Sequence, residues 1–372
     1  MPWVRRTRHL ALSAADDDPL VVIRSLLTGT CVSLEPPELA ALLALPIRSW
    51  RWREEGDPWA EELGRDGLLV SDDPHEPFPG LRRRDEELTA LAWWPEAAAL
   101  HLGSRWEDVQ AEVPGRGGSR TLFEYPGAPL PALPVHGGPR TALPRSDETT
   151  ALRRLLARRR TVRTFDDALQ PVNIVELATL LRWVWGARGT LQLAGADVGL
   201  KRTSPSSGAL HPIEVYPVVR RVEGLQSGLY HYLGGEHALE QVAALDEGSA
   251  RALVEDGTVG QWYFADADVA FVMTARFWRV NRKYRRNEKI YRATLVDAGH
   301  LSQTFYLLCT ELGLGPWVTM ALNEVVLERA LDLEPLDEGV IAVCGCGRPD
   351  TSGHSSFLQP SFVPLDPPEA ST

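Results

Sequence analysis

The run RATLVDAGHLSQTFYLLCTELGLG, residues 292–315, is the feature of this sequence that most constrains its fold. Its apolar residues recur every three to four positions, which predicts one long helix that buries a single face. Strand-like patterns precede and follow it, so helices and strands interleave in the second half of the chain. Because this pattern does not require parallel strands, we expect an α+β fold. The apolar stripe consists of Leu295, Ala298, Leu301, Phe305, Leu308 and Leu312.

Shorter patterns in the same half predict the elements around this helix. A basic helix is expected over residues 149–160, and a second helix over 171–186 with Asn173 as its N-cap. Pro217 interrupts the strand pattern IEVYPVVRRV, which indicates an edge strand or a bulge. Alternating or continuous apolar runs predict strands over residues 213–222, 228–235, 266–276 and 338–347.

The composition restricts the partners that the chain can have. Hydrophobic residues make up 44% and the formal net charge is −11, which argues against a nucleic-acid partner because phosphate binding needs clustered basic surface. No apolar run reaches about 18 residues, so no membrane span is expected. Four scattered cysteines are too few for a disulfide framework, and we therefore expect a cytoplasmic protein. These cysteines are Cys31, Cys309, Cys344 and Cys346.

Four parts are visible along the chain. Residues 1–113 carry 12 Lys and Arg against 21 Asp and Glu, and we expect them to form a separate N-terminal domain. Residues 114–149 hold 13 Pro and Gly in 36 positions, which is typical of a linker. Residues 150–352 contain the strongest periodic patterns, and residues 353–372 are Pro-rich and expected to form an extended C-terminal arm.

The N-terminal part is expected to be mainly helical. Helices are predicted over residues 18–29 and 33–46, the second with Ser33 as its cap, and residues 57–73 predict a third helix, a glycine turn and a strand. Three small helices followed by a strand resemble a winged-helix module. The local acidity disfavours DNA, so a peptide groove beside the strand is one interpretation. A helical scaffold without a ligand is the other.

Two small clusters in the second half have residues suited to an anionic or flat ligand. RTSPSSGALHP, residues 202–212, is a tight loop of small residues whose backbone amides allow close approach of a ligand. Residues 159–163, RRTVR, place arginine forks at a helix end, where they match phosphate geometry. An ordinary turn and a solvated helix end are the alternatives. A second turn with phosphate-binding character is expected over residues 345–348.

Other candidate ligands are interpreted as packing residues. Cys344 and Cys346 form a CxC pair without a second pair at ligand spacing, so no metal site is expected. His300 and Gln303 on the long helix are interpreted as hydrogen-bonded polar residues of the core.

Three of these features occur together in a known family. An RR[ST]xR segment, a PSSGALHP loop and a helix that ends in GLG resemble the FMN-binding frame of the nitroreductase superfamily, over about residues 150–350. RTSPSSGALHPIEVY followed by SGLYHY is similar to the SagB-type dehydrogenases. The resemblance implies a nitroreductase-like three-layer fold with a central mixed sheet. It also implies a homodimer with the flavin at the subunit interface.

The resemblance further implies which residues bind FMN. The small loop residues would lie along the flavin ring, and the arginines would hold its phosphate and ribityl chain. Plain nitroreductases have Asn and Gln where this chain has Ala209 and His211, which favours the SagB-like branch. The implied FMN-binding residues are Arg159, Arg160, Thr161, Arg163, Pro205, Ser206, Ser207, Gly208, His211, Gly313, Leu314, Gly315 and Arg348.

Lys283 and Tyr284 match the Lys-Tyr pair ascribed to catalysis in azoline oxidases. Aromatising an azoline removes a hydride to the flavin and a proton from the neighbouring carbon, so a base is required. A lysine in a partly dry pocket can supply that base, directly or by activating the tyrosine. The alternative is a solvated basic run, because other cations surround the pair.

By this resemblance the chain is an FMN-dependent oxidoreductase that oxidises azolines to azoles during maturation of a ribosomally made peptide. The implied partners are a modified precursor peptide and a cyclodehydratase. Two other functions stay open from the sequence. One is an NAD(P)H-dependent reductase of dehydroamino acids or small electrophiles on the same frame. The other is a non-catalytic adaptor that presents a peptide to a cyclase.

Overall fold

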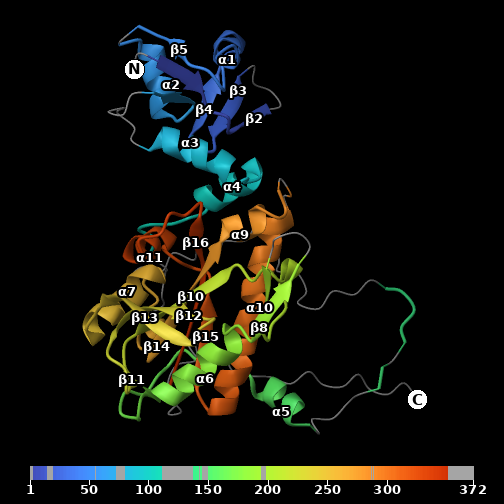
Figure 1. Cartoon of the computed structure of the whole chain (residues 1–372), viewed down its shortest axis with the longest axis vertical. Coiled ribbons are helices and arrows are strands. Elements are labelled where there is room, and N and C mark those ends of the chain that lie inside the picture. The colour runs from blue at the N-terminus through green and yellow to red at the C-terminus, as the bar shows by residue number, and fades with distance from the viewer. Residues whose placement is uncertain are drawn as a thin grey trace.

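The fold is that of a large α+β unit with a smaller unit attached at one end (Figure 1). The predicted linker lies largely outside the described residues, and the predicted C-terminal arm lies entirely outside them, so both stay predictions. The computed structural model describes residues 3–14, 20–54, 56–72, 80–110, 137–141, 143–144, 150–193, 198–285, 287 and 289–350.

A six-stranded sheet forms the centre of the large unit, in the order β13-β12-β10-β14-β16-β15. Among the described residues, every pairing within this sheet is antiparallel. The expectation of mixed strand directions in this sheet is therefore wrong for the described residues, and the parallel pair β7–β11 forms a separate sheet. The strands of the sheet are β10 (Ile213–Val219), β12 (Gly228–Leu233), β13 (Ala238–Ala244), β14 (Val269–Arg276), β15 (Gly315–Thr319) and β16 (Glu338–Gly347).

The expectation of an edge strand at Pro217 is wrong, because β10 lies between β12 and β14. Pro217 pairs with Phe271 of β14, but the ladder between β10 and β12 involves only Val218 and Val219 on the β10 side. A proline lacks the N–H that a second ladder needs. The strand therefore accommodates Pro217 just before its pairing with β12 begins.

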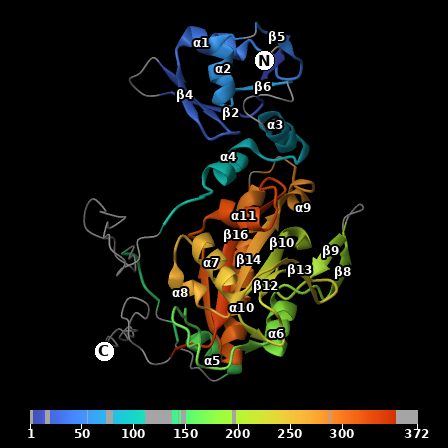
Figure 2. The same ribbon diagram turned by 90° about the vertical axis from the view of Figure 1, so that its left-hand side faces the viewer.

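Helices cover both faces of the sheet, which gives three layers (Figure 2). Side chains alternate along β14, so Phe271 and Met273 pack with α6 and α10, while Ala270 and Val272 pack with α7, α8 and α11. The predicted α+β class and three-layer arrangement are confirmed. The helices of this unit are α5 (Ala151–Arg158), α6 (Ile174–Val184), α7 (Glu247–Gly257), α8 (Trp262–Ala265), α9 (Phe277–Asn281), α10 (Lys289–Leu312) and α11 (Glu324–Ala330).

Local chemistry explains the two helices that matter most for the site. Asn173 caps α6 as predicted, and Glu176 completes a capping box with it. Helix α10 is a single helix of 24 residues, as predicted, and its apolar stripe packs on the sheet. The smaller elements of this unit are β7 (Val172–Asn173), β8 (Gly189–Gln192), β9 (Val198–Lys201), the 3-10 turn η1 (Ser207–Ala209) and β11 (Val222–Glu223).

The N-terminal unit differs from the predicted order of three helices and a strand. Residues 21–25 form a strand that pairs on both sides, so the helix predicted over 18–29 is wrong. The β-branched run Val21-Val22-Ile23 favours that strand. The next helix is confirmed, but Ser33 lies in β4 and Glu35 is the N-cap.

The third predicted segment of this unit is confirmed as α2, a turn at Gly67 and β6. Two further helices follow before the large unit. The elements of the N-terminal unit are β1 (Trp3–Arg6), β2 (Leu10–Ala14), β3 (Val21–Ser25), β4 (Cys31–Leu34), α1 (Pro36–Leu43), β5 (Arg51–Trp52), α2 (Pro58–Arg65), β6 (Leu69–Ser71), α3 (Leu81–Ala90) and α4 (Pro95–Gly103).

Helices α3 and α4 join the N-terminal unit to the large unit, next to α9 (Figure 1). The indole N–H of Trp93 donates to the Leu336 carbonyl at 2.8 Å, and His101 Nε2 bonds the Pro335 carbonyl at 2.8 Å. Trp93 also packs on Phe277 of α9 with ring centres 4.6 Å apart. Within the described part of the chain, no helix combines the length and apolar character that a membrane span requires.

Candidate active site

The loop over residues 204–211, called the serine loop here, has an unusual backbone. Gly208, Ala209 and His211 have φ angles of 62°, 57° and 48°, in the left-handed region that non-glycine residues rarely adopt. Such strain persists only where surrounding contacts hold it, and it is concentrated at functional sites. The predicted tight loop is therefore confirmed, and its contacts explain how it is held.

A buried carboxylate of α10 anchors the serine loop. The Ser206 hydroxyl donates to Asp297 at 2.5 Å, and the His211 backbone N–H donates to the same hydroxyl at 2.9 Å. The backbone amide of Ser207 also bonds Asp297. Burial raises the pKa of Asp297, although these two bonds oppose the shift. These hydrogen bonds thus fix the serine loop to α10.

A buried arginine and a buried histidine belong to the same region of the chain. Arg202 is 6% exposed and donates from Nη1 to the Ile213 carbonyl at 2.8 Å. Its Nε has no hydrogen-bond partner among the described residues. His211 is also 6% exposed, and burial together with Arg202 and Arg279 lowers the pKa of His211 to about 4. His211 is therefore neutral near neutral pH.

The structure brings Lys283 and Tyr284 to the serine loop. A Cβ atom at Gly208 would overlap the Tyr284 hydroxyl and would lie 3.0 Å from Lys283 Nζ. With a φ of 62° and no side chain, Gly208 allows the close approach of this pair without strain. Lys283 Nζ lies 5.5 Å from the centre of the Tyr284 ring, and Tyr284 packs against the apolar cluster that contains Leu210. Two groups of residues that the sequence places far apart therefore meet at one point.

The segment over residues 159–163, called the arginine segment here, is extended and lies beside β15 and α10. The Thr161 hydroxyl and the Tyr306 hydroxyl are 3.0 Å apart, and the Arg159 guanidinium lies 5.5 Å from the centre of the Tyr306 ring. Val162 N–H donates to the Pro316 carbonyl at 2.8 Å. Within the described residues, Arg159, Arg160 and Arg163 form no ion pair with a carboxylate. The segment therefore presents positive charge that its surroundings do not neutralise.

The predicted Gly-Leu-Gly residues close a pocket beside this segment. The pocket measures about 310 Å³, and its walls include Arg158, Arg160, Gly313 and Leu314. Gly315 stands where a Cβ atom would come within 2.7 Å of Val162, so only glycine permits this close packing. The arginine segment and the end of α10 thus line one pocket.

The serine loop and the arginine segment lie on opposite sides of α10. Asp297 and Thr304, which contact the loop, are seven residues apart and share one side of the helix. Tyr306, which contacts the arginine segment, is nine residues from Asp297, about two and a half turns, and faces the other way. The strip of α10 between the two sides is exposed at Val296, Gly299, His300 and Gln303. The expectation that His300 and Gln303 are polar residues of the core is therefore wrong, because both are exposed.

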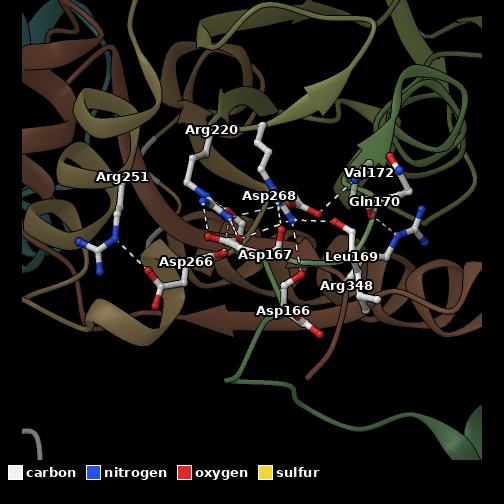
Figure 3. Close-up of polar contacts among 12 residues, drawn as sticks. Asp166, Asp167, Leu169, Gln170, Val172, Arg220, Arg251, Asp266, Asp268 and Arg348 are labelled. Atoms are coloured by element: carbon white, nitrogen blue, oxygen red, sulfur yellow. Dashed lines mark hydrogen bonds and ion pairs between the residues drawn. The ribbon is translucent and has the colours of Figure 1, made fainter. Parts of the chain in front are cut away.

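Arg348 stands apart from the arginine segment in its contacts. Its Nη2 pairs with Glu176 of α6 at 2.7 Å. Its Nε donates to the Gln170 carbonyl, as Figure 3 shows. The same view shows Arg220 bonded to Asp167, which follows the arginine segment in the sequence. Arg348 thus belongs to a structural network.

The turn predicted over residues 345–348 is wrong. Gly345, Cys346 and Gly347 are the last residues of β16. A side chain at Gly345 would overlap Trp317, so this glycine serves core packing. Cys344 and Cys346 are fully buried in the same strand.

Three residues of the site escaped prediction from the sequence, namely Arg202, Asp297 and Tyr306. For Asp297 the sequence held a signal, since this acid stands one position before Ala298 of the apolar stripe. In the structure Asp297 is 4% exposed. Arg202 opens the loop motif itself. Tyr306 had no signal that separates it from an ordinary core tyrosine.

Comparisons with known proteins match this part of the chain. The model of the Nitroreductase family matches residues 156–348. The nitroreductase-like protein MJ1384 of Methanocaldococcus jannaschii is 30% identical over 168 residues, 45% of this chain and 77% of that protein.

Two further relatives are peptide-processing proteins. The trifolitoxin-processing protein TfxB of Rhizobium leguminosarum is 30% identical over 168 residues, 45% of this chain and 44% of TfxB. The microcin B17-processing protein McbC of Escherichia coli is 30% identical over 142 residues, 36% of this chain and 50% of McbC. The matches thus span about half of these two proteins. With the family model covering more than half of the sequence, this chain belongs to the nitroreductase family.

Proposed function

We propose that this protein is an FMN-dependent dehydrogenase of the SagB type, which oxidises azoline rings of a ribosomally made peptide to azoles. One observation carries the proposal: Lys283 and Tyr284 lie against Gly208 of the serine loop. Binding of FMN by the nitroreductase fold does not by itself require a Lys-Tyr pair at this loop. A proton-accepting group beside the flavin loop is what aromatisation of a ring requires.

The residues present fit FMN, which the nitroreductase family typically binds. Arg159, Arg160 and Arg163 have no carboxylate partner among the described residues, so they are available for a terminal phosphate. The strained serine loop offers backbone groups and small side chains to a flat ring, at Pro205, Ser206 and Ser207. Gly313, Leu314 and Gly315 would close the phosphate end. When bound, FMN would supply the acceptor for a hydride.

The chain's own residues would handle the proton. Removing two hydrogens from the ring as a hydride and a proton leaves the proton to be taken by a base. Tyr284 Oη and Lys283 Nζ both reach the space above Gly208. We assign the base to this pair, with Lys283 accepting the proton directly or through Tyr284. His211 is a poorer candidate because its side chain is buried.

A homodimer completes the proposed site. In one chain, the serine loop and the arginine segment lie on opposite sides of α10, so one chain does not place both against one flavin. A second copy packed along the exposed strip of α10 would bring its arginine segment to this serine loop. Exposed apolar residues near the strip, Val296, Leu152 and Leu156, support a covered surface.

The relatives TfxB and McbC support a peptide substrate, because both are peptide-processing proteins by name. We propose a modified precursor peptide as substrate and a cyclodehydratase as the partner that makes its azolines. We propose the cytoplasm as the place of this reaction, where ribosomal peptides are made. The N-terminal unit would serve peptide binding.

Mass spectrometry of a precursor peptide tests this function. The peptide, already carrying azolines, is incubated with the FMN-reconstituted protein. Loss of about two mass units per ring is expected, since two hydrogens leave. A gain of about two mass units with NAD(P)H would instead identify a reductase. A protein that takes up no FMN and leaves the peptide unchanged would support the adaptor and overturn the proposal.

A further inference from the structure

A cavity of about 880 Å³ lies outside the candidate active site. It lies where the N-terminal unit meets the large unit, and we call it the junction cleft. One wall comes from α3, α4 and the corner between them, and another from residues 8, 9, 47 and 48. The large unit contributes Arg285, the residue directly after Tyr284.

The junction cleft is cationic in a chain that is acidic overall. Its lining includes Arg8, Arg48 and Arg285 against one carboxylate, Glu96, whereas the whole chain has a formal net charge of −11. Arg48 and Arg285 are exposed and form no ion pair with any described residue. Glu96 lies in the first turn of α4, where the helix dipole already favours a negative charge. The two arginines therefore remain available to an anionic ligand.

The floor of the cleft is apolar and built on a strained corner. Trp93, Trp94 and Leu88 contribute ring and aliphatic surface, and Ile47 is 36% exposed at the rim. Ala92, between α3 and α4, has a φ of 54°. An alanine in this conformation costs free energy, which contacts elsewhere must offset. Cations above an apolar floor suit a chain that carries both carboxylates and apolar side chains.

The cationic surface continues toward the reactive pair. Arg276, Arg279 and Arg282 line a second pocket of about 400 Å³ together with Leu210 of the serine loop. Arg282 of this pocket and Arg285 of the junction cleft flank Lys283 and Tyr284 in the sequence. The reactive pair thus lies between the two pockets along the chain.

We propose that the junction cleft binds an acidic peptide segment with interspersed apolar residues, at a distance from the ring that is oxidised. Nucleic acid is disfavoured by the overall negative charge. The proposal extends the proposed function, since a peptide substrate would use the cleft, but binding itself requires neither flavin nor turnover. Binding and catalysis can therefore fail separately.

Fluorescence anisotropy on the full chain tests the proposal. The probe is a short fluorescein-labelled peptide of alternating Glu and Leu. We expect it to bind, and to bind more weakly as ionic strength rises, because exposed charges are screened. The charge-reversal variants Arg48→Glu and Arg285→Glu should each weaken binding by about tenfold. Arg24→Glu, an exposed arginine on β3 outside the cleft, is the matched control and should bind like the parent.

Circular dichroism and thermal unfolding of each variant show that the fold is kept. A Gln-Leu peptide that binds as tightly as the Glu-Leu peptide would overturn the assignment, because the arginines would then play no part. Equal loss in Arg24→Glu would overturn it as well. A single-stranded oligonucleotide that competes as well as the peptide would replace it with a nucleic-acid site. None of these results depends on ring oxidation.

Discussion

The serine loop and the arginine segment belong to one proposed site, yet they are built in opposite ways. The loop has its own partners: Ser206 donates to Asp297 of α10 and accepts from the His211 amide, beside the left-handed backbone. The arginine segment has no carboxylate partners among the described residues, although Thr161 and Val162 fix its backbone and one hydroxyl.

The difference separates preorganisation from affinity. A loop that carries its own strain and partners holds its shape in the free protein, so its residues contribute to folding stability. Cations without partners contribute little to folding, and their interaction energy is gained when an anion binds. Variants in the two regions should therefore fail in different measurements.

The largest expected effect is on the reactive pair, which touches the loop but is not part of it. Lys283→Ala and Tyr284→Phe should each lower the rate of ring oxidation by on the order of 10²–10⁴, since a positioned base is lost. Bound flavin, measured by absorbance, should stay at the parental level. Turnover at the parental rate in both variants would show that the base lies elsewhere.

The next effect concerns the arginine segment. Arg160→Glu should weaken FMN binding by about 10²-fold, because a like charge replaces a phosphate partner. The unfolding free energy of the flavin-free protein should change by less than about 0.5 kcal/mol, as for most exposed substitutions. Titration of flavin fluorescence and thermal unfolding measure the two quantities. Arg24→Glu serves as the control. A large loss of stability in the flavin-free protein would contradict the inference that these arginines contribute little to folding.

The opposite pattern is expected for Asp297→Asn. Replacing the buried carboxylate should lower the unfolding free energy of the flavin-free protein by about 1–3 kcal/mol, since Ser206 and the Ser207 amide lose a charged acceptor. Ser206→Ala should give a similar loss, and the double variant should lose less than the sum, because both residues share one network. Urea unfolding provides the values. Additive losses would mean that the two residues act independently.

The smallest effect is a pH dependence that originates at the buried His211 of the serine loop. His211 has its pKa lowered to about 4, so the unfolded chain binds the proton more tightly than the folded protein between about pH 4 and 6.5. Stability should therefore fall as pH decreases through this window, by about 1 kcal/mol between pH 7 and 5.5 for this residue.

His211→Asn, chosen because asparagine tolerates the left-handed backbone, should remove that part of the slope. Thermal unfolding across the pH range measures it. His101, whose pKa burial also lowers to about 4, should keep its own contribution in the variant. An unchanged slope would show that His211 is not the group responsible.

Local signals in the sequence were sufficient for much of the large unit. The strand over 338–347 and the cap at Asn173 follow from apolar runs and capping chemistry, which depend on neighbours in sequence. The helix predicted over 18–29 failed because pairing with β2 and β4 decides that segment, and no local pattern reports such partners. The edge-strand prediction at Pro217 failed for the same reason, since the point where β10 begins to pair with β12 depends on tertiary structure.

The candidate site shows the same division. The loop and the arginine segment were identified by composition and resemblance. Their attachment to α10 was not, because Ser206 and Asp297 are 91 residues apart and Thr161 and Tyr306 are 145 apart. Which side of a long helix each segment meets depends on how the sheet is assembled, and periodicity alone carries no such information.

The single long helix also has a consequence for communication between sites. Helix α10 extends about 36 Å as one rod, with the loop anchor on one side and the arginine contact on the other. In the proposed dimer, each α10 would therefore contribute to both flavins. A small tilt of the rod on binding at one flavin would move a contact of the other, so the two sites would respond as a coupled pair, with the first binding event altering the affinity of the second.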